Sequence, residues 1–292
     1  MAIESVMNAI AGQDWLQEAG DPLQKAIHGL FGNDRAGRAV KDLLHGTWLG
    51  HPLHPVLVNL PIGAWTVALV FDALEGLGGS DDLAAGAETA IGIGILGALG
   101  AAVTGATDWS DTGGRSEKIG LVHGLLNVVA TGLYTASWIV RRKRRRDTGV
   151  ALSMLGFAIA SGSAYLGGHL VFGEQVGVDH TATIDAEQPE HFTSVMLESA
   201  LNEGEPKRVD VNGVKVLLLR HGGKIRAFHE ICPHLGGPLS EGKVVGDAIE
   251  CPWHGSQFCI DDGSVVAGPA TAPARSFDVR VQEGNIEVRA IR

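Results

Sequence analysis

The chain has 292 residues, 23 Lys or Arg against 33 Asp or Glu, and a formal net charge of −10. This length suits two domains, and the acidic balance without a long basic stripe argues against a nucleic-acid partner. Only three cysteines occur, Cys232, Cys251 and Cys259, which excludes a disulfide framework. Long apolar runs lie before residue 173, whereas charged residues alternate with Val, Ile and Leu after residue 190.

Residues 1–45 are polar and mixed, without the apolar core and cleavage site of a signal peptide. We expect a soluble stretch of short helices here. Asp21 followed by Pro22 is one expected helix start, because proline is favoured in the first turn of a helix.

Four apolar segments with almost no charge follow in residues 56–71, 89–107, 119–140 and 149–172. Each is near the 20 or so residues that cross a bilayer as a helix, the first if it extends to Leu74 and tolerates Asp72. The second segment is rich in small residues, which let helices approach closely in lipid. A large soluble helical core is the alternative. Four such segments separated by short polar loops instead favour an antiparallel four-helix transmembrane bundle over residues 46–175.

The run Leu49-Gly50-His51-Pro52-Leu53-His54-Pro55, together with Gly167-Gly168-His169-Leu170, resembles a family of bacterial multi-pass membrane domains of unknown function. The resemblance covers about residues 45–175 and implies a place in the bacterial cell membrane, but no established chemistry. The basic run at 141–146 favours a cytoplasmic loop and an external C-terminal domain. A similar number of basic residues lies at the opposite end of the expected bundle. Both orientations of the C-terminal domain across the membrane therefore stay open.

Four histidines fall near one end of the expected bundle: His51, His54, His123 and His169. The C-terminal domain follows the fourth segment and so emerges at the same end. Ionisable groups at membrane depth tend to face the bundle interior or a functional pathway, so these residues form a candidate second site for haem b, a quinone or a metal. The alternative is that they are structural histidines, hydrogen-bonded to Asn127 or to backbone carbonyls.

After an expected linker at 176–191, two short boxes carry the chemistry: box 1 is Cys232-Pro233-His234, and box 2 is Cys251-Pro252-Trp253-His254. Glycines follow each box, and 16 residues separate the two boxes. Two thiolates and two imidazoles are what a Rieske [2Fe–2S] cluster needs, because one iron takes two Cys sulfurs and the other takes two His nitrogens. Four such ligands could also bind zinc. Zinc motifs, however, usually pair Cys with Cys and His with His, whereas each box here mixes the two.

The boxes and their glycines closely resemble the Rieske family over residues 192–292. The resemblance implies a small antiparallel all-β domain and a [2Fe–2S] cluster bound by Cys232, His234, Cys251 and His254, with both histidines facing solvent. It also implies that the proline-containing loop Gly268-Pro269-Ala270 covers the cluster.

The same resemblance bears on the reduction potential, which spans about −150 to +300 mV in this class. Gly237 and Trp253 stand where high-potential members carry a disulfide, and Phe258 stands where they carry a tyrosine. Ser256 is the remaining expected hydrogen-bond donor to a ligand sulfur. We therefore expect a potential in the lower half of the range. Cys259 is expected to be a small buried apolar residue.

Two hairpins are expected around the boxes. One pairs residues 209–211 with 214–220 through an Asn212-Gly213 turn, and the other pairs 275–281 with 286–289 through Glu283-Gly284. Together with the apolar half, they predict a multi-domain fold: a transmembrane four-helix bundle followed by a small antiparallel all-β domain.

These features predict a membrane-anchored carrier of single electrons that acts with a redox partner protein and a lipid bilayer, and they leave room for a homo-oligomer. We expect a component of an oxidoreductase system rather than a self-contained enzyme, with no catalytic residues of its own. The alternatives are a redox-sensing or structural membrane protein, or the electron-donating component of an oxygenase system. The roughly 40 residues after box 2 leave no room for the catalytic domain of an oxygenase.

Overall fold

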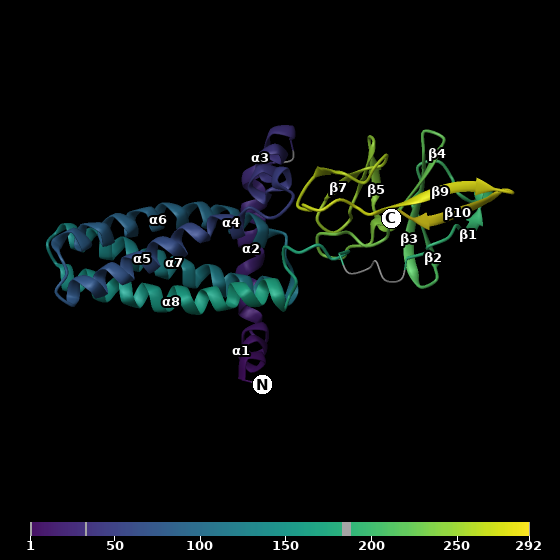
Figure 1. The fold of residues 1–292 in the computed structure, drawn as a ribbon. Coiled ribbons are helices and arrows are strands. Elements are labelled where there is room, and N and C mark those ends of the chain that lie inside the picture. Colours follow the sequence, from purple (N-terminus) through teal and green to yellow (C-terminus); the bar gives the residue numbers. More distant parts are fainter. Residues whose placement is uncertain (1, 33, 183–187, 292) are drawn as a thin grey trace. The chain divides into compact units, whose positions relative to one another are not determined.

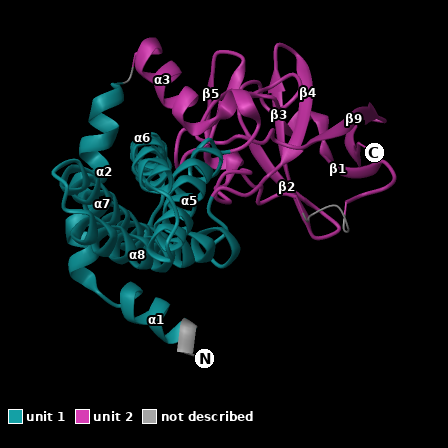
Figure 2. Ribbon diagram, turned by 60° about the vertical axis from the view of Figure 1, so that its left-hand side comes forward, with its two compact units in different colours: residues 1–32, 52–176 teal, residues 33–51, 177–292 magenta. Residues whose placement is uncertain are grey.

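The computed structural model describes residues 2–32, 34–182 and 188–291, and the chain divides into two compact units (Figures 1 and 2). Unit 1 comprises residues 1–32 and 52–176, and unit 2 comprises residues 33–51 and 177–292. The chain therefore passes from one unit to the other three times. The domain bounds expected from the sequence assign residues 33–45 to an N-terminal stretch, and they stay a prediction.

Unit 1 is helical. Its helices are α1 (Ala2–Ala11), α2 (Asp14–Phe31), α4 (His54–Leu57), α5 (Asn59–Gly76), α6 (Asp81–Ser110), α7 (Gly114–Arg142) and α8 (Arg146–Phe172). Helices α5 to α8 run side by side as a bundle, and α1 and α2 lie across it (Figure 1). Within the described residues, four helical segments are long and apolar enough to cross a membrane, the first of them being α4 and α5 together.

The expected helix start at Asp21 is wrong. Helix α2 begins at Asp14 and contains Pro22 in its interior. A proline there lacks the N–H that would bond to the carbonyl of Glu18. Pro22 and Glu18 are both exposed, so water can satisfy that carbonyl and the helix continues.

Small residues let the bundle helices pack closely. The Trp65 indole of α5 stacks on the Tyr134 ring of α7, with centroids 3.9 Å apart and planes at 10°. A side chain at Gly94 of α6 would collide with that indole. The glycine-rich pattern of the second apolar segment thus has a direct packing reason.

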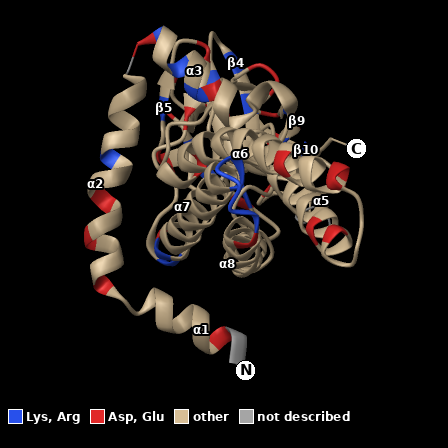
Figure 3. Ribbon diagram, turned by 90° about the vertical axis from the view of Figure 1, so that its left-hand side faces the viewer, with Lys and Arg blue, Asp and Glu red and all other residues tan. Residues whose placement is uncertain are grey.

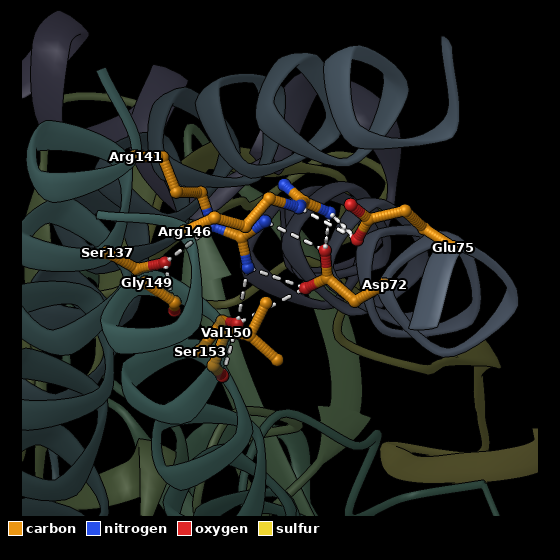
Figure 4. A network of polar contacts seen from close by, with 8 residues as sticks. All are labelled: Asp72, Glu75, Ser137, Arg141, Arg146, Gly149, Val150 and Ser153. Carbon is orange, nitrogen blue, oxygen red and sulfur yellow. Dashed lines mark hydrogen bonds and ion pairs between the residues drawn. The ribbon is translucent and has the colours of Figure 1, made fainter. Parts of the chain in front are cut away.

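A buried ion-pair network joins three helices at one end of the bundle (Figure 4). Arg141 of α7 donates from both terminal nitrogens to the Asp72 carboxylate of α5, at 2.7 and 2.5 Å. Arg146 of α8 donates to Asp72 Oδ1 at 2.8 Å and forms an ion pair with Glu75 at 2.7 Å. Arg141 also donates to Ser153 Oγ at 2.9 Å. Figure 3 faces this end and shows the basic α7–α8 connection in blue.

Unit 2 contains two antiparallel sheets. The six-stranded sheet has the order β1-β10-β9-β4-β3-β2, and the four-stranded sheet has the order β5-β6-β7-β8. The strands are β1 (Thr193–Leu197), β2 (Lys207–Val211), β3 (Val214–His221), β4 (Lys224–His229), β5 (Lys243–Val245), β6 (Ala248–Glu250), β7 (Gln257–Cys259), β8 (Val265–Ala267), β9 (Ser276–Gln282) and β10 (Asn285–Ala290).

Both expected hairpins are present. Val211 pairs with Val214 across the first turn, where Asn212 and Gly213 have φ values of 55° and 90°. Positive φ at both central residues is what a tight two-residue hairpin needs, and Asn-Gly supplies it at low cost. The four-stranded sheet was not expected, because its strands of three residues leave no readable alternation. Strand β1 was not expected either.

The core of unit 2 next to the boxes contains both box cysteines, buried together with Phe258, Leu217 and Ile249. A fully buried phenylalanine or leucine side chain contributes about 1.5–3 kcal/mol. The predicted multi-domain architecture, four long apolar helices followed by an antiparallel all-β domain, is confirmed.

Candidate metal centre

The two boxes lie in two loops with the same backbone hydrogen bonds. In the loop between β4 and β5, the Cys232 N–H donates to the Gly237 carbonyl at 2.8 Å, and the Gly236 N–H donates to the Cys232 carbonyl at 3.0 Å. In the loop between β6 and β7, Cys251 pairs in the same way with Ser256 at 2.8 Å and with Gly255 at 3.1 Å. Gly236 and Gly255 both have φ between 75° and 81°, a conformation that favours glycine at this position of each loop.

The two cysteine sulfurs lie side by side. A hydrogen bond from the Cys232 thiol to the Cys251 sulfur lowers the pKa of Cys251, whereas the same bond, followed by burial, raises the pKa of Cys232. Backbone N–H groups also point at each sulfur. Those of His234 and Leu235 point at Cys232, and those of Trp253 and His254 point at Cys251. Such donors stabilise a thiolate, the form that binds metal.

The two histidines form a second pair. The rings of His234 and His254 have centroids 5.1 Å apart and planes at 84°. Both residues are half-buried, whereas Cys232 and Cys251 are 1% and 3% exposed. The loops therefore place two sulfurs inside the domain and two imidazoles toward its surface.

This donor set fits two metal atoms with two protein ligands each. A structural zinc ion would need four ligands around one point. Paired sulfurs beside paired imidazoles, with amides directed at the sulfurs, are the arrangement that a [2Fe–2S] cluster with mixed ligands requires.

The comparisons with known proteins bear directly on this arrangement. The family model of the Rieske [2Fe–2S] domain matches residues 191–278. The ferredoxin subunit of 3-phenylpropionate/cinnamic acid dioxygenase from Escherichia coli K12 is 38% identical over 85 residues, which are 29% of this chain and 79% of that protein. The chain belongs to the Rieske [2Fe–2S] family. Its Rieske domain implies a [2Fe–2S] cluster.

Two further relatives each match about a third of this chain. Apoptosis-inducing factor 3 of Homo sapiens is 33% identical over 90 residues, which are 31% of this chain and 15% of that protein's length. The solved ferredoxin of carbazole 1,9a-dioxygenase from Nocardioides aromaticivorans is 30% identical, with 35% of this chain and all of that chain covered and a TM-score of 0.33. Residues 50–180 of the protein described here match a second family, described as predicted membrane protein (DUF2231).

The positions tied to reduction potential lie beside the cysteines of the Rieske domain. A Cβ atom at Gly237 would lie 2.8 Å from the Cys251 sulfur and 3.1 Å from the Trp253 ring. Gly237 and Trp253 thus face each other, and their equivalence to a disulfide position stays a prediction. Phe258 is fully buried. Ser256 Oγ accepts from the Ala270 N–H at 3.0 Å. Its expected bond to a ligand sulfur and the low potential stay predictions.

Cys259 is less buried than expected. It is half-buried rather than buried. Hydrogen bonds from Ser264, and to a smaller extent one from the Cys259 side chain, lower the pKa of Asp262. A turn of acidic and glycine residues follows β7 and leaves this side of the strand open to water.

Two structural contacts to box 1 were missed from the sequence. Glu230 is buried and accepts from the Ser240 hydroxyl at 2.6 Å, which closes the base of the box 1 loop, and burial raises its pKa. The His180 N–H donates to the Pro233 carbonyl at 3.0 Å. Because residue 180 lies in the expected linker, no local pattern pointed to this contact.

Of the four histidines proposed as a second site, His54 and His123 lie close together in the helical unit. The rings of His54 and His123 are 6.5 Å apart. His123 Nδ1 contacts the Ser163 carbonyl at 2.8 Å, and Nε2 contacts Asn127 at 3.1 Å. His169 contacts Glu174 at 3.2 Å, and His51 belongs to the other unit. These contacts match the structural alternative, and nothing in the comparisons supports haem b or a quinone.

Proposed function

We propose that this protein is a membrane-anchored carrier of single electrons, with the cluster held by Cys232 and Cys251 on one iron and by His234 and His254 on the other. The observation that supports this assignment most directly is the pairing of two buried sulfurs with two half-buried imidazoles in loops of matching backbone geometry. When bound, such a cluster accepts and releases one electron at a time.

The four residues then have two different tasks. The cysteines lie in the core with amide donors directed at their sulfurs, so they stabilise the added negative charge and exclude water. The histidines lie nearer the surface, which shortens the path to a partner. Ferredoxin subunits among the relatives favour delivery of electrons to a partner protein, such as the terminal component of an oxidoreductase.

Anchoring in a membrane is the second part of the proposal. Four helical segments have the length and composition of bilayer spans, and the matched DUF2231 family is described as a membrane protein. Many large apolar side chains point outward from these helices, among them Leu96 at 71% and Val128 at 66% exposed. Such an apolar exterior suits contact with lipid rather than with water.

The ligand assignment is tested by removing one sulfur or one imidazole. Cys232→Ser and His234→Ala should abolish the Rieske electron-paramagnetic signal of detergent-purified protein, while the polypeptide still reaches the membrane fraction. Cys259→Ser and His221→Ala serve as matched controls, because both residues lie in the same unit and neither belongs to a box. Retention of the signal in Cys232→Ser, or a protein saturated with zinc and free of acid-labile sulfide, would contradict the assignment.

A redox sensor remains the other candidate for this geometry. An electron carrier should exchange electrons with a small ferredoxin or a flavoprotein reductase in repeated turnovers, as followed by visible absorbance of the cluster. A sensor would instead be reduced once and would change its own conformation or binding.

A further inference from the structure

The segment that precedes the bundle belongs to the same unit as the Rieske domain. Helix α3 (Arg35–His45) and the short turn η1 (Thr47–Leu49) lie in unit 2 with both sheets (Figure 2). The early turns of α3 are largely exposed, whereas His45 at its end is 2% exposed. Helix α3 therefore contacts the rest of the unit through its C-terminal turn.

That turn contacts the cover loop, Gly268-Pro269-Ala270. Asp42 Oδ1 accepts from the Gly268 N–H at 2.7 Å, across 226 residues of sequence. The Asp42 carbonyl in turn accepts from the Gly46 N–H and from the Thr47 hydroxyl, both at 3.1 Å. The end of α3 and the η1 turn thus hold the Asp42 carbonyl, next to the side chain that contacts the cover loop.

Gly268 is closed in by the same segment. A Cβ atom added there would lie 2.8 Å from Thr47 Cγ2 and 3.7 Å from His45 Cδ2. A distance of 2.8 Å is shorter than real Cβ contacts allow. The cover loop and the η1 turn therefore fit each other only because residue 268 lacks a side chain.

The other end of the cover loop is bonded to box 2. The Ala270 N–H donates to Ser256 Oγ at 3.0 Å, and Ser256 is fully buried. The Ser256 carbonyl accepts from the Cys251 N–H at 2.8 Å. One end of the loop is thus held by α3 and the other by the residue that closes the box 2 turn.

We propose that residues 34–51 are a structural part of the Rieske domain and that Asp42 is a positioning residue for the loop that covers the cluster. The proposal rests on the function proposed above. A hydrogen bond to an ionised carboxylate is roughly twice as strong as one between neutral groups, and the potential of such a cluster depends on hydrogen bonds and solvent exposure. A segment outside the matched family region of residues 191–278 thereby sets how tightly the site is closed.

The first test compares Asp42→Asn with Asp34→Asn in the full-length protein in detergent. Both changes remove one negative charge from the α3 region. Asp34 only caps the helix, accepting from the Gly37 N–H at 2.8 Å, and asparagine caps equally well. We expect amide hydrogen exchange of the peptide containing residues 268–270 to be about fivefold faster in Asp42→Asn. We also expect its cluster to be lost faster in air and its midpoint potential to shift upward. Asp34→Asn should match the wild type.

The second test is a change of size at the contact itself. Gly268→Ala should accelerate hydrogen exchange of the loop and shorten the lifetime of the cluster. Adding Thr47→Ser should restore both, because serine keeps the hydroxyl bonded to the Asp42 carbonyl and lacks the methyl group that the new Cβ would meet. Residues 47 and 268 are far apart in the sequence, so rescue of one substitution by the other indicates that the two side chains are in direct contact.

Equal behaviour of Asp42→Asn and Asp34→Asn, or no rescue of Gly268→Ala by Thr47→Ser, overturns the proposal. A wild-type protein without a Rieske signal would instead overturn the proposed function. The exchange measurements would still decide whether α3 holds the loop.

Discussion

Gly237 lies where the two boxes of the Rieske domain meet, and it leaves no room for a side chain. A Cβ atom there would lie 2.8 Å from the sulfur of Cys251, one of the four proposed cluster ligands. We expect Gly237→Ala to destabilise the cluster-containing domain by about 1–3 kcal/mol, the usual cost of overpacking. The midpoint of thermal bleaching of the cluster absorbance measures this loss. An unchanged midpoint, with full iron content, would contradict the crowding argument.

His229 and Glu230 lie beside box 1, and their contributions to the free energy of unfolding change in opposite directions with pH. Burial, followed by the positive charge of Arg275, lowers the pKa of His229 below 6.5, whereas burial raises the pKa of Glu230 above 4.5. The neutral His229 ring accepts from the Ile231 N–H at 3.1 Å. Its contribution is therefore complete above about pH 6.5 and is lost as pH falls through the lowered pKa.

We accordingly expect the free energy of unfolding to fall less steeply between pH 6.5 and 5 in His229→Gln than in the wild type. Glutamine has no titrating group, so the difference between the two slopes isolates the histidine from Glu230. Denaturant titrations at several pH values, followed by cluster circular dichroism, give both slopes. Parallel slopes would show that His229 is not buried as a neutral ring.

At the scale of elements, the bundle is joined at one end by the Asp72–Arg141 pair, whose side chains are 3% and 2% exposed. Asp72→Asn leaves the Arg141 charge buried without its counter-ion, and such a loss costs about 3–5 kcal/mol. Arg142→Gln is the matched control, because its pair with Glu88 is exposed and exposed pairs contribute about 0–1 kcal/mol. Unfolding in mixed micelles with increasing dodecyl sulfate compares the two. Similar losses for both variants would refute a special role for the buried pair.

Across the whole molecule, the sequence predicted those features that short stretches encode by themselves. Box 1 and box 2 carry their chemistry in three or four residues, the Asn212-Gly213 turn determines its own hairpin, and the apolar runs are long enough to predict the bundle. Contacts between distant residues left no such pattern. The partner of Asp72 lies 69 residues away in Arg141, and the contact between Asp42 and Gly268 spans most of the chain. Strands β5 to β8 have three residues each, too few for a period.

If the four apolar helices cross a bilayer as proposed, the discontinuous composition of unit 2 restricts how the chain threads through it. Residues 33–51 come before the apolar helices and residues 177–292 come after them, yet both fold into one body. A body of this kind forms only if the two pieces emerge on the same side of the membrane, so the number of crossings between them must be even. The four proposed spans satisfy this parity, whereas three or five would separate Asp42 from the loop it contacts.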